Sequence, residues 1–319
     1  MRKYQVPSRW KGTWQLVNTL APYFALWVAM YFAMSVSWWL VIPLALLAGG
    51  FVVRAFIIFH DCTHGSFFKS KRANEITGFF TGVLTFTPYH LWRWEHSIHH
   101  SSSGDLDRRG TGDIWTLTVE EDAASSRWRR FTYRMARNPI VLFVIAPALM
   151  MLIYQRFPTR RAPKRDNRWL HATNLAIAGM CTLGIWIFGL VPFLIIQLIV
   201  LTIASSSGVW LFYVQHQFED THWSKPPEWT FQHAAMHGAS HYDLPRPLRW
   251  ITGNIGMHHV HHLSSRIPFY RLPEVLRDHP ELTGLGRITI SDSLACVKLI
   301  LWDEASQRLV SLKEAERRL

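Results

Sequence analysis

The sequence predicts an all-α integral membrane protein, in which four transmembrane helices form two hairpins and a cytosolic helical cap holds a histidine-ligated dimetal site. Three observations support this prediction. Four apolar stretches are long enough to cross a bilayer, the basic residues lie largely outside them, and histidines gather in three short motifs. No internal repeat or low-complexity linker divides the chain, so we expect one domain over residues 1–319.

The four apolar stretches come in two pairs. A hydrocarbon core about 30 Å thick requires roughly 20 apolar residues at a rise of about 1.5 Å each. The connections within the pairs, Ser35–Ser37 and Phe188–Pro192, carry no charge, and the Gly and Pro of the second are typical of a turn. The first stretch is too long and too aromatic for a cleaved signal peptide. The predicted spans are residues 16–34, 38–59, 170–188 and 191–214.

The basic residues predict the orientation of these spans. The formal net charge is +12 at pH 7, and membrane proteins concentrate Lys and Arg in their cytoplasmic segments. Both termini, the metal site and the two long polar segments, 60–137 and 215–319, are therefore expected on the cytoplasmic side, where the polar segments form the cap. The basic runs lie at residues 2–11, 69–72, 127–137 and 156–168 and in the C-terminal tail.

A fifth apolar stretch, residues 139–154, complicates this arrangement. If it crossed the membrane completely, the basic residues from Arg156 to Arg165 would lie on the outer side, against the charge rule. We therefore expect this stretch to form a re-entrant or interfacial element.

The cysteines and the basic charge narrow the class of protein. Cys62, Cys181 and Cys296 are far apart and match no CxxC or zinc-ribbon spacing, so a disulfide framework is not expected. This fits sites that face a reducing cytosol. A basic cytosolic face attracts both an acidic redox partner and anionic lipid headgroups, and composition does not separate these two uses. No nucleic-acid partner is expected.

Histidines gather at the spacing of one helix face. His60 and His64 follow directly on the second span at i and i+4, so their rings point the same way. Two further motifs, residues 96–100 and 258–262, supply i, i+3 and i+4, and His216 lies just beyond the fourth span. The candidate metal ligands are His60, His64, His96, His99, His100, His216, His258, His261 and His262.

Nine imidazoles are too many for one ion, but they suit two ions with four or five nitrogens each and positions left for water or dioxygen. Imidazole binds zinc, copper, iron and nickel, and no clustered cysteine offers a softer alternative. Because neutral ligands leave the centre cationic, nearby carboxylates should orient the rings and lower the local charge. Asp61 and Asp105 are the candidates for this role, and His90 either supports a ligand or packs at the membrane interface.

The remaining histidines are not expected to bind the metals. His259 should face away from its neighbours in the third motif. The others are expected on the surface or in loops, and they are His171, His222, His233, His237, His241 and His279.

Three segments resemble the membrane fatty acid desaturases, and most closely the bacterial and plastid-like acyl-lipid group that includes Δ12 and ω-3 enzymes. They are His60–Phe68, Pro88–His100 and Gly253–Tyr270, and the Ser265-Arg-Ile-Pro-Phe-Tyr270 sequence is a specific part of the resemblance. The three motifs together are specific, whereas each alone is weak. The chain departs from stearoyl-type members, which place an Asn one turn before the ligand after the fourth helix to hold a metal-bound water; Phe212 stands there.

The resemblance implies a mushroom-like architecture, two iron ions, and dioxygen as the oxidant. It also implies the ligand role for the nine histidines named above. The implied reaction introduces a cis double bond into the acyl chain of a membrane lipid. Because no cytochrome b5-like segment is recognisable in the chain, the electrons are expected from a separate ferredoxin or cytochrome-type protein.

An unactivated C–H bond sets the chemical requirement, because no amino-acid side chain removes hydrogen from a methylene group. The acyl chain is expected to enter an apolar tunnel lined in part by Trp92, Trp94 and Phe86. A hydroxylase or ketolase on the same scaffold is the main alternative, since it needs only altered substrate placement. A zinc membrane hydrolase would use fewer histidines and a general-base carboxylate. The motifs do not determine acyl length, double-bond position, acyl carrier or oligomeric state.

Overall fold

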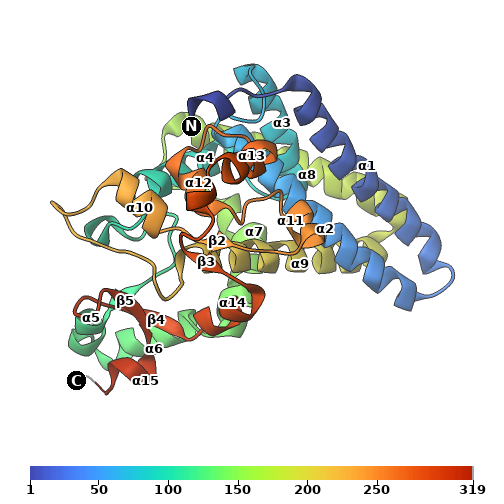
Figure 1. Ribbon diagram of the computed structural model, residues 1–319. Helices are drawn as coiled ribbons and strands as arrows, with labels where there is room; N and C mark the ends of the chain where they lie inside the picture. The colour runs from blue at the N-terminus through green and yellow to red at the C-terminus, as the bar shows by residue number, and fades with distance from the viewer. Residues whose placement is uncertain (318–319) are drawn as a thin grey trace.

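Four long apolar helices dominate the computed structural model, which describes residues 1–317 (Figure 1). Each is long and apolar enough to cross a membrane, and each contains one of the predicted spans. The helical membrane fold is therefore confirmed, while the last two residues of the predicted cap lie outside the described residues. The four helices are α1 (Arg9–Met34), α2 (Trp38–Thr63), α8 (Lys164–Phe188) and α9 (Leu190–His216).

Both hairpins turn within a few residues. Ser37 ends the first connection as the N-cap of α2, and its hydroxyl accepts a hydrogen bond from the Trp39 amide. Only Gly189 separates α8 from α9, and its φ of 83° is a conformation that glycine adopts without steric strain. The helices α2 and α9 run in the same direction, since Gly49 of α2 lies against Ile203 of α9 and both helices then reach the same end of the bundle, where His60 and His216 lie.

The second helix, α2, is the central one of the four. It packs against α1, α9 and α3 (Lys71–Leu84), and its last three turns are almost entirely buried. Gly49 permits the close approach to α9, because a Cβ atom at this position would lie 2.7 Å from Cγ2 of Ile203. Large apolar side chains on the outer faces of the other spans are exposed, such as Phe32, Trp186 and Leu194. Such extended exposed apolar surface is expected of faces that meet a bilayer.

One buried cation ties the spans to the polar part of the chain. The Arg54 guanidinium of α2 donates to Oγ1 of Thr19 over 3.1 Å, to the side-chain oxygen of Gln15 and to the carbonyl of Trp250. It also lies 4.0 Å from the centroid of the Trp250 ring. All three guanidinium nitrogens thus have a partner, as a buried charge requires. The contact fastens α11 (Arg246–Ile251) to α1 and α2, close to the end of the bundle that carries His60.

The polar segments fold into short helices around that end of the bundle (Figure 1). The remaining α-helices of the polar segments are α4 (Tyr89–Ser102), α5 (Val119–Ala124), α6 (Arg127–Ala136), α10 (Phe231–His237), α12 (His258–Leu263), α13 (Leu272–Asp278), α14 (Ile290–Cys296) and α15 (Leu312–Ala315). Single 3₁₀ turns are η1 (Arg2–Tyr4), η2 (Leu106–Arg108), η4 (Tyr154–Arg156), η5 (Phe269–Arg271) and η6 (Pro280–Leu282).

Two small sheets, which the sequence analysis did not predict, complete the polar part. The first has the order β1 (Leu117–Thr118), β4 (Leu299–Asp303) and β5 (Arg308–Ser311), with β1 parallel and β5 antiparallel to β4. The second pairs β2 (His241–Tyr242) in parallel with β3 (Arg287–Ile288). Since β1 belongs to the first polar segment and β4 to the second, the two segments are in direct contact.

The apolar stretch 139–154 does not form a straight fifth span. It contains a π-helical turn, η3 (Val141–Ile145), followed by α7 (Ala146–Leu152), and both pack against α9. The helix axis bends by 59° between α6 and the segment Val141–Arg156. Ile140, Leu149 and Ile153 are exposed on its outer side. This shape fits either a re-entrant element or a broken span, so the membrane topology of the stretch stays a prediction.

Cysteine labelling in membrane vesicles tests this topology. We expect Ala123→Cys and Arg161→Cys, each in a chain without the three native cysteines, to react with a membrane-impermeant maleimide from the same face. Both positions are exposed, and a re-entrant element leaves its two flanks on one side. Val36→Cys, in the exposed turn between α1 and α2, is the control and should react from the opposite face. Labelling of positions 123 and 161 from opposite faces would establish a fifth crossing.

Candidate metal centre

The first two histidine motifs are locked together at the end of α2. Gly78 of α3 leaves room for the Tyr89 ring of α4, because a Cβ atom at position 78 would lie 2.2 Å from Cε2 of that ring. The buried Tyr89 hydroxyl donates to the carbonyl of Cys62, 2.7 Å away in the last turn of α2. The contact holds α4 in a fixed position relative to His60 and its neighbours.

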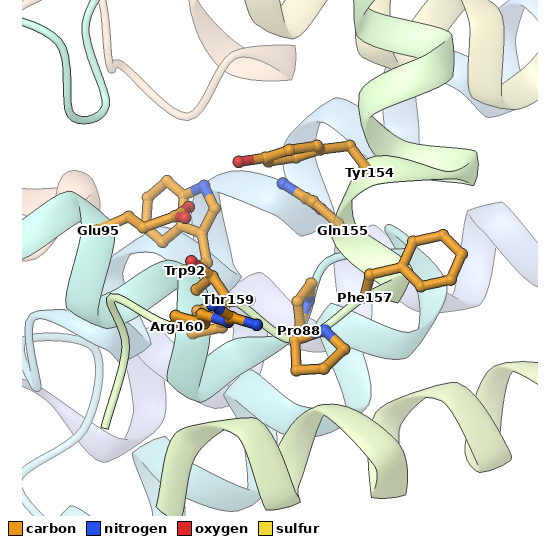
Figure 2. Close-up of a pocket in the computed structure, with 10 residues that line it drawn as sticks. Pro88, Trp92, Glu95, Tyr154, Gln155, Phe157, Thr159 and Arg160 are labelled. Atoms are coloured by element: carbon orange, nitrogen blue, oxygen red, sulfur yellow. The ribbon is translucent and has the colours of Figure 1, made fainter. Parts of the chain in front are cut away.

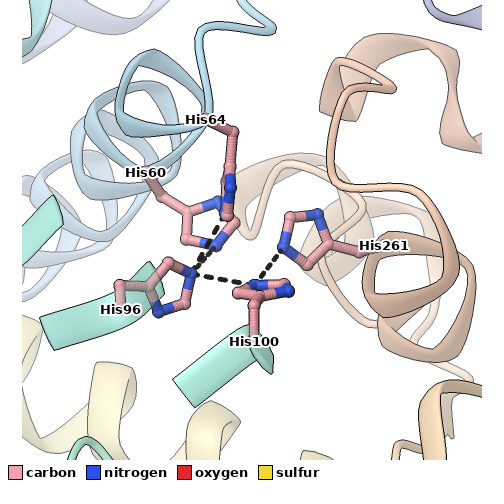
Figure 3. A group of neighbouring side chains, drawn as sticks. All are labelled: His60, His64, His96, His100 and His261. Carbon is pink, nitrogen blue, oxygen red and sulfur yellow. Dashed lines mark hydrogen bonds between the residues drawn. The ribbon is translucent and has the colours of Figure 1, made fainter. Parts of the chain in front are cut away.

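Nine histidines converge in two groups, and they are the nine that the motifs single out. Within each group, one nitrogen from every ring lies within 4.8 Å of the others. Figure 3 shows the rings of the first group directed toward a common centre from α2, α4 and α12. The first group is His60, His64, His96, His100 and His261, and the second group is His99, His216, His258 and His262.

The motifs on α4 and α12 each serve both groups. On α4, His96 and His100 at i and i+4 belong to the first group, whereas His99 at i+3 belongs to the second. On α12 the pattern is reversed, since only His261 enters the first group. Adjacent residues of an α-helix are about 100° apart around its axis, so a single turn presents rings to two neighbouring centres.

Burial disfavours the protonated form of several of these rings. It holds the pKa of His96 and His100 well below the ordinary value, and the neighbouring imidazoles lower it further. The same two causes, in the same order, lower the pKa of His258, His261 and His262. A neutral imidazole has a free lone pair on one nitrogen, which is the form that binds a metal.

Hydrogen bonds at the outer nitrogens fix the direction of two lone pairs. Nδ1 of His99 lies 2.7 Å from Oδ1 of Asp113, and Nδ1 of His216 lies 3.1 Å from the carbonyl oxygen of Gly238. A carboxylate and a carbonyl only accept, so each Nδ1 carries the proton. The Nε2 atoms of His99 and His216 then face each other as acceptors, 3.2 Å apart. Facing lone pairs repel unless a cation lies between them, so the second group fits a metal ion.

The first group has the same spacing. Nε2 of His96 lies 3.0 Å from that of His60 and 3.1 Å from those of His64 and His100. Two nitrogens bound at about 2.1 Å from one ion, at right angles to each other, lie about 3 Å apart. Within residues 1–317, neither group includes a carboxylate or a thiolate. Both groups therefore fit ions that accept imidazole ligands.

The two carboxylates expected to support the ligands, Asp61 and Asp105, differ in their distance from the histidines. Asp61 lies beside His60, with Oδ1 3.5 Å from Nδ1, while its Oδ2 accepts from the Phe269 amide at 2.6 Å. Asp61 thereby fastens the segment after α12 to α2. Asp105 binds Arg108 and a backbone amide instead, and contacts none of the nine histidines among the described residues.

His90 lies away from both groups, at the contact between α4 and α8. Its ring stacks on Trp169, with centroids 4.9 Å apart and planes at 27°. The ring is buried, and its Nδ1 has no hydrogen-bond partner among residues 1–317. These contacts indicate that His90 packs between helices and does not support a ligand.

Asp113 is the carboxylate that the sequence analysis missed. It lies in the loop after η2, and Gly112 brings it to His99. Gly112 has a φ of 74°, and a Cβ atom there would lie 3.1 Å from the Cβ atom of His99. Only a glycine allows the loop to pass this close to α4. The glycines at 110 and 112 were the one signal in the sequence, since no helical spacing links the loop to α4.

Aromatic rings enclose the centre on two sides. The Trp92 ring stacks on His96 of the first group, with centroids 4.1 Å apart and planes at 24°. Phe212 lies against two rings of the second group, with centroids 5.2 Å from His99 and 5.1 Å from His216. The position one turn before His216 is thus filled by an apolar ring, which offers no polar atom to hold a water.

Most of the remaining histidines lie where they were expected, with His241 as the correction. His171 and His233 are exposed, and His222, His237 and His279 are partly exposed. His241 is buried instead, because β2 pairs with β3 over it and its Nδ1 lies 2.8 Å from a backbone carbonyl. His259 is buried outside both groups, with Nε2 2.9 Å from another carbonyl.

Substitution of Asp113 tests its support of His99. Asp113→Asn keeps the shape of the side chain but removes the charge that holds the Nδ1 proton, so metal affinity should fall by about 10- to 100-fold. Asp107→Asn, an exposed carboxylate on η2, is the matched control. Metal content after dialysis against graded chelator concentrations, measured by mass spectrometry, compares the two variants. Equal retention in both would contradict the role of Asp113.

Comparison with known proteins places the chain in a family. The family model described as fatty acid desaturase matches residues 37–292, a segment that includes all nine histidines. A fatty acid desaturase of Bacillus subtilis is 46% identical over 94% of this chain and 85% of its own length.

More distant relatives carry more specific names. An sn-1 oleoyl-lipid 12-desaturase of Synechocystis sp. is 27% identical over 73% of this chain and 67% of its own length. An sn-1 acyl-lipid omega-3 desaturase (ferredoxin) from the same organism is 27% identical over 77% of this chain and 69% of its own length. With two histidine groups at the end of a four-helix membrane bundle and a family match over most of its length, this chain belongs to the fatty acid desaturase family.

Proposed function

We propose that this chain is an O2-dependent desaturase that introduces a cis double bond into the acyl chain of a membrane lipid, with two iron ions bound by the two histidine groups. The observation that carries the proposal is the set of nine histidines, seven of them buried and two partly buried, divided five and four, in a member of the fatty acid desaturase family. The acyl-lipid names of two relatives support a lipid substrate.

The donor set favours iron over zinc. Zinc sites in proteins are almost always four-coordinate, and catalytic ones keep a position open for water. The first group alone offers five imidazoles, which exceeds that number. Iron accepts imidazole ligands and, when bound here, would supply the electron transfer to dioxygen that attack on an unactivated methylene requires.

The residues of the chain hold and orient the rings. Asp113 and the Gly238 carbonyl keep the proton on the outer nitrogens of His99 and His216, so the inner lone pairs stay directed to the centre. Phe212 keeps water away from the same two rings. Exclusion of water limits side reactions during an oxidation.

A pocket of about 260 Å³ lies one aromatic ring away from the first group. Trp92 lines it and stacks on His96. Figure 2 shows the polar ends of Glu95, Tyr154 and Gln155 directed toward the same space. Burial raises the pKa of the Glu95 carboxyl above its ordinary value. We infer that the pocket receives the ester-bearing end of the lipid, while the acyl chain passes Trp92.

The other aromatic residues expected in a tunnel lie in separate clusters. Phe86 packs with Met151 and Ile177, and Trp94 packs with Leu91 and Leu170. The approach of the acyl chain is therefore assigned to Trp92 alone.

The basic segments support a membrane orientation for this chain, and a relative supports an electron donor. The basic segments support a chain with both termini and the metal centre on the cytoplasmic side, acting as a single domain. One relative is named as a ferredoxin-dependent desaturase, "sn-1 acyl-lipid omega-3 desaturase (ferredoxin)", which supports a separate one-electron donor of ferredoxin or cytochrome type.

Fatty acid analysis of an expression host tests this function. We expect gas chromatography–mass spectrometry to find a new unsaturated acid with the unmodified chain and none with His99→Ala, because the second group then loses one of its four rings. Iron content should fall with activity while membrane insertion persists, since the spans do not depend on the ligands. His171→Ala removes an exposed histidine outside both groups and is the matched control.

The alternatives give different results in the same experiment. A new hydroxy or keto acid in place of the alkene would assign the chain to the hydroxylase or ketolase class. Full desaturation by His99→Ala would reject the metal assignment, and loss of activity in His171→Ala as well would show that the assay reports general damage.

A further inference from the structure

A second hollow, of about 390 Å³, reaches the metal centre through one carboxylate. Its walls come from η2, β1, the loop between them, α5 and α6, and they include Asp113 and Trp115. Oδ1 of Asp113 lies 2.7 Å from Nδ1 of His99, a member of the second group. A single side chain therefore connects this hollow to a candidate metal ligand.

Four arginines lie on α6, a helix that forms part of the wall of the hollow. The helix α6 carries Arg127, Arg129, Arg130 and Arg134, and Arg129 lines the hollow itself. Arg134 lies 3.8 Å from a glutamate, while the other three make no salt bridge within residues 1–317. We call the hollow together with these four residues the arginine surface. Such a concentration of positive charge raises the association rate of an acidic partner by about 10- to 1000-fold.

Exposed aromatic rings accompany the arginines. Trp115 at the hollow and Trp128 and Phe131 on α6 are exposed, and the last two stack on each other with centroids 5.5 Å apart. Arginine and aromatic residues are enriched in interfaces between proteins. Figure 1 shows α6 at the far end of the molecule from the turn between α1 and α2, so the arginine surface lies far from that turn.

We propose that the arginine surface is the docking site of an acidic one-electron carrier protein of the ferredoxin class, which reduces the metal centre through the Asp113–His99 hydrogen bond. This inference rests on the proposed desaturase function. Each turnover removes two hydrogens from adjacent carbons of the acyl chain. It also takes up one O2, two protons and two electrons, releases two waters, and oxidises two reduced carrier molecules.

The two hollows approach different histidine groups. The pocket of Figure 2 meets the first group through Trp92 and is lined on another side by Tyr154, the last residue of the 139–154 stretch. The hollow at the arginine surface meets the second group through Asp113. A lipid and a carrier protein can therefore occupy their sites at the same time, as a reaction that needs both requires.

Charge reversal on α6 tests the docking site. The variant Arg129→Glu/Arg130→Glu is compared with Lys71→Glu/Arg72→Glu, which reverses two exposed charges at the start of α3. Each iron-loaded protein is assayed with reduced plant-type ferredoxin and, separately, with dithionite and methyl viologen. We expect the α6 variant to bind ferredoxin about tenfold more weakly in surface plasmon resonance without turnover, to raise the KM for ferredoxin by a similar factor and to lose most of the ionic-strength dependence, because rim charges act on association. Its turnover with the chemical reductant should equal that of the α3 variant.

Each other outcome has a separate meaning. An unchanged KM for ferredoxin in the α6 variant rejects the docking site. Equal loss with both reductants also rejects it, because the arginines would then support the fold and not the carrier. Weaker binding to phosphatidylglycerol vesicles with an unchanged KM assigns α6 to the membrane surface instead. Absence of an unsaturated product from the unmodified chain with either reductant would reject the desaturase function itself.

Discussion

The facing lone pairs of the histidine rings are the constraint on which the rest of this structure depends. Nine imidazoles lie in one buried region, and the Nε2 atoms of His99 and His216 approach to 3.2 Å with both protons held on the outer nitrogens. Without cations the inward lone pairs of these rings would repel one another. Binding of cations requires that helices from distant parts of the chain keep fixed relative positions. The parallel course of α2 and α9, the Tyr89–Cys62 hydrogen bond and the buried Arg54 contacts all stiffen the end of the bundle where this occurs.

Helix periodicity makes the two groups a single unit. Because α4 and α12 each give rings to both groups, neither helix can shift without disturbing both. The close packing around them leaves little freedom, since Gly78 admits the Tyr89 ring and Gly112 admits the loop that carries Asp113. Interiors packed at this density transmit small displacements instead of absorbing them. Residues outside the two groups, such as Tyr89 and Asp113, therefore help to fix the positions of the rings, as the helices that carry the rings do.

Each of the two histidine groups has its own hollow beside it. Trp92 lies between the first group and a pocket next to the apolar 139–154 stretch, whereas Asp113 lies between the second group and a hollow edged by arginines. Phe212 closes the second group against water on a further side. The proposed desaturation needs an apolar substrate and a polar electron donor at one centre, and separate approaches let each meet a surface of matching character.

The sequence by itself determined the four spans, the nine histidines and the family, because these signals are local: a run of apolar residues matches the bilayer thickness, and i, i+3 and i+4 spacing matches one helix turn. It could not divide the histidines into five and four, since that depends on where α4 and α12 cross α2 and α9. Nor could it find Asp113 or the burial of His241, because both result from loops and short strands that meet segments far away in the chain. Asp105, which has the same carboxylate and is closer to His99 in sequence, binds Arg108 instead. The tertiary structure alone made those choices, because a carboxylate pairs with whichever donor the packing brings within reach.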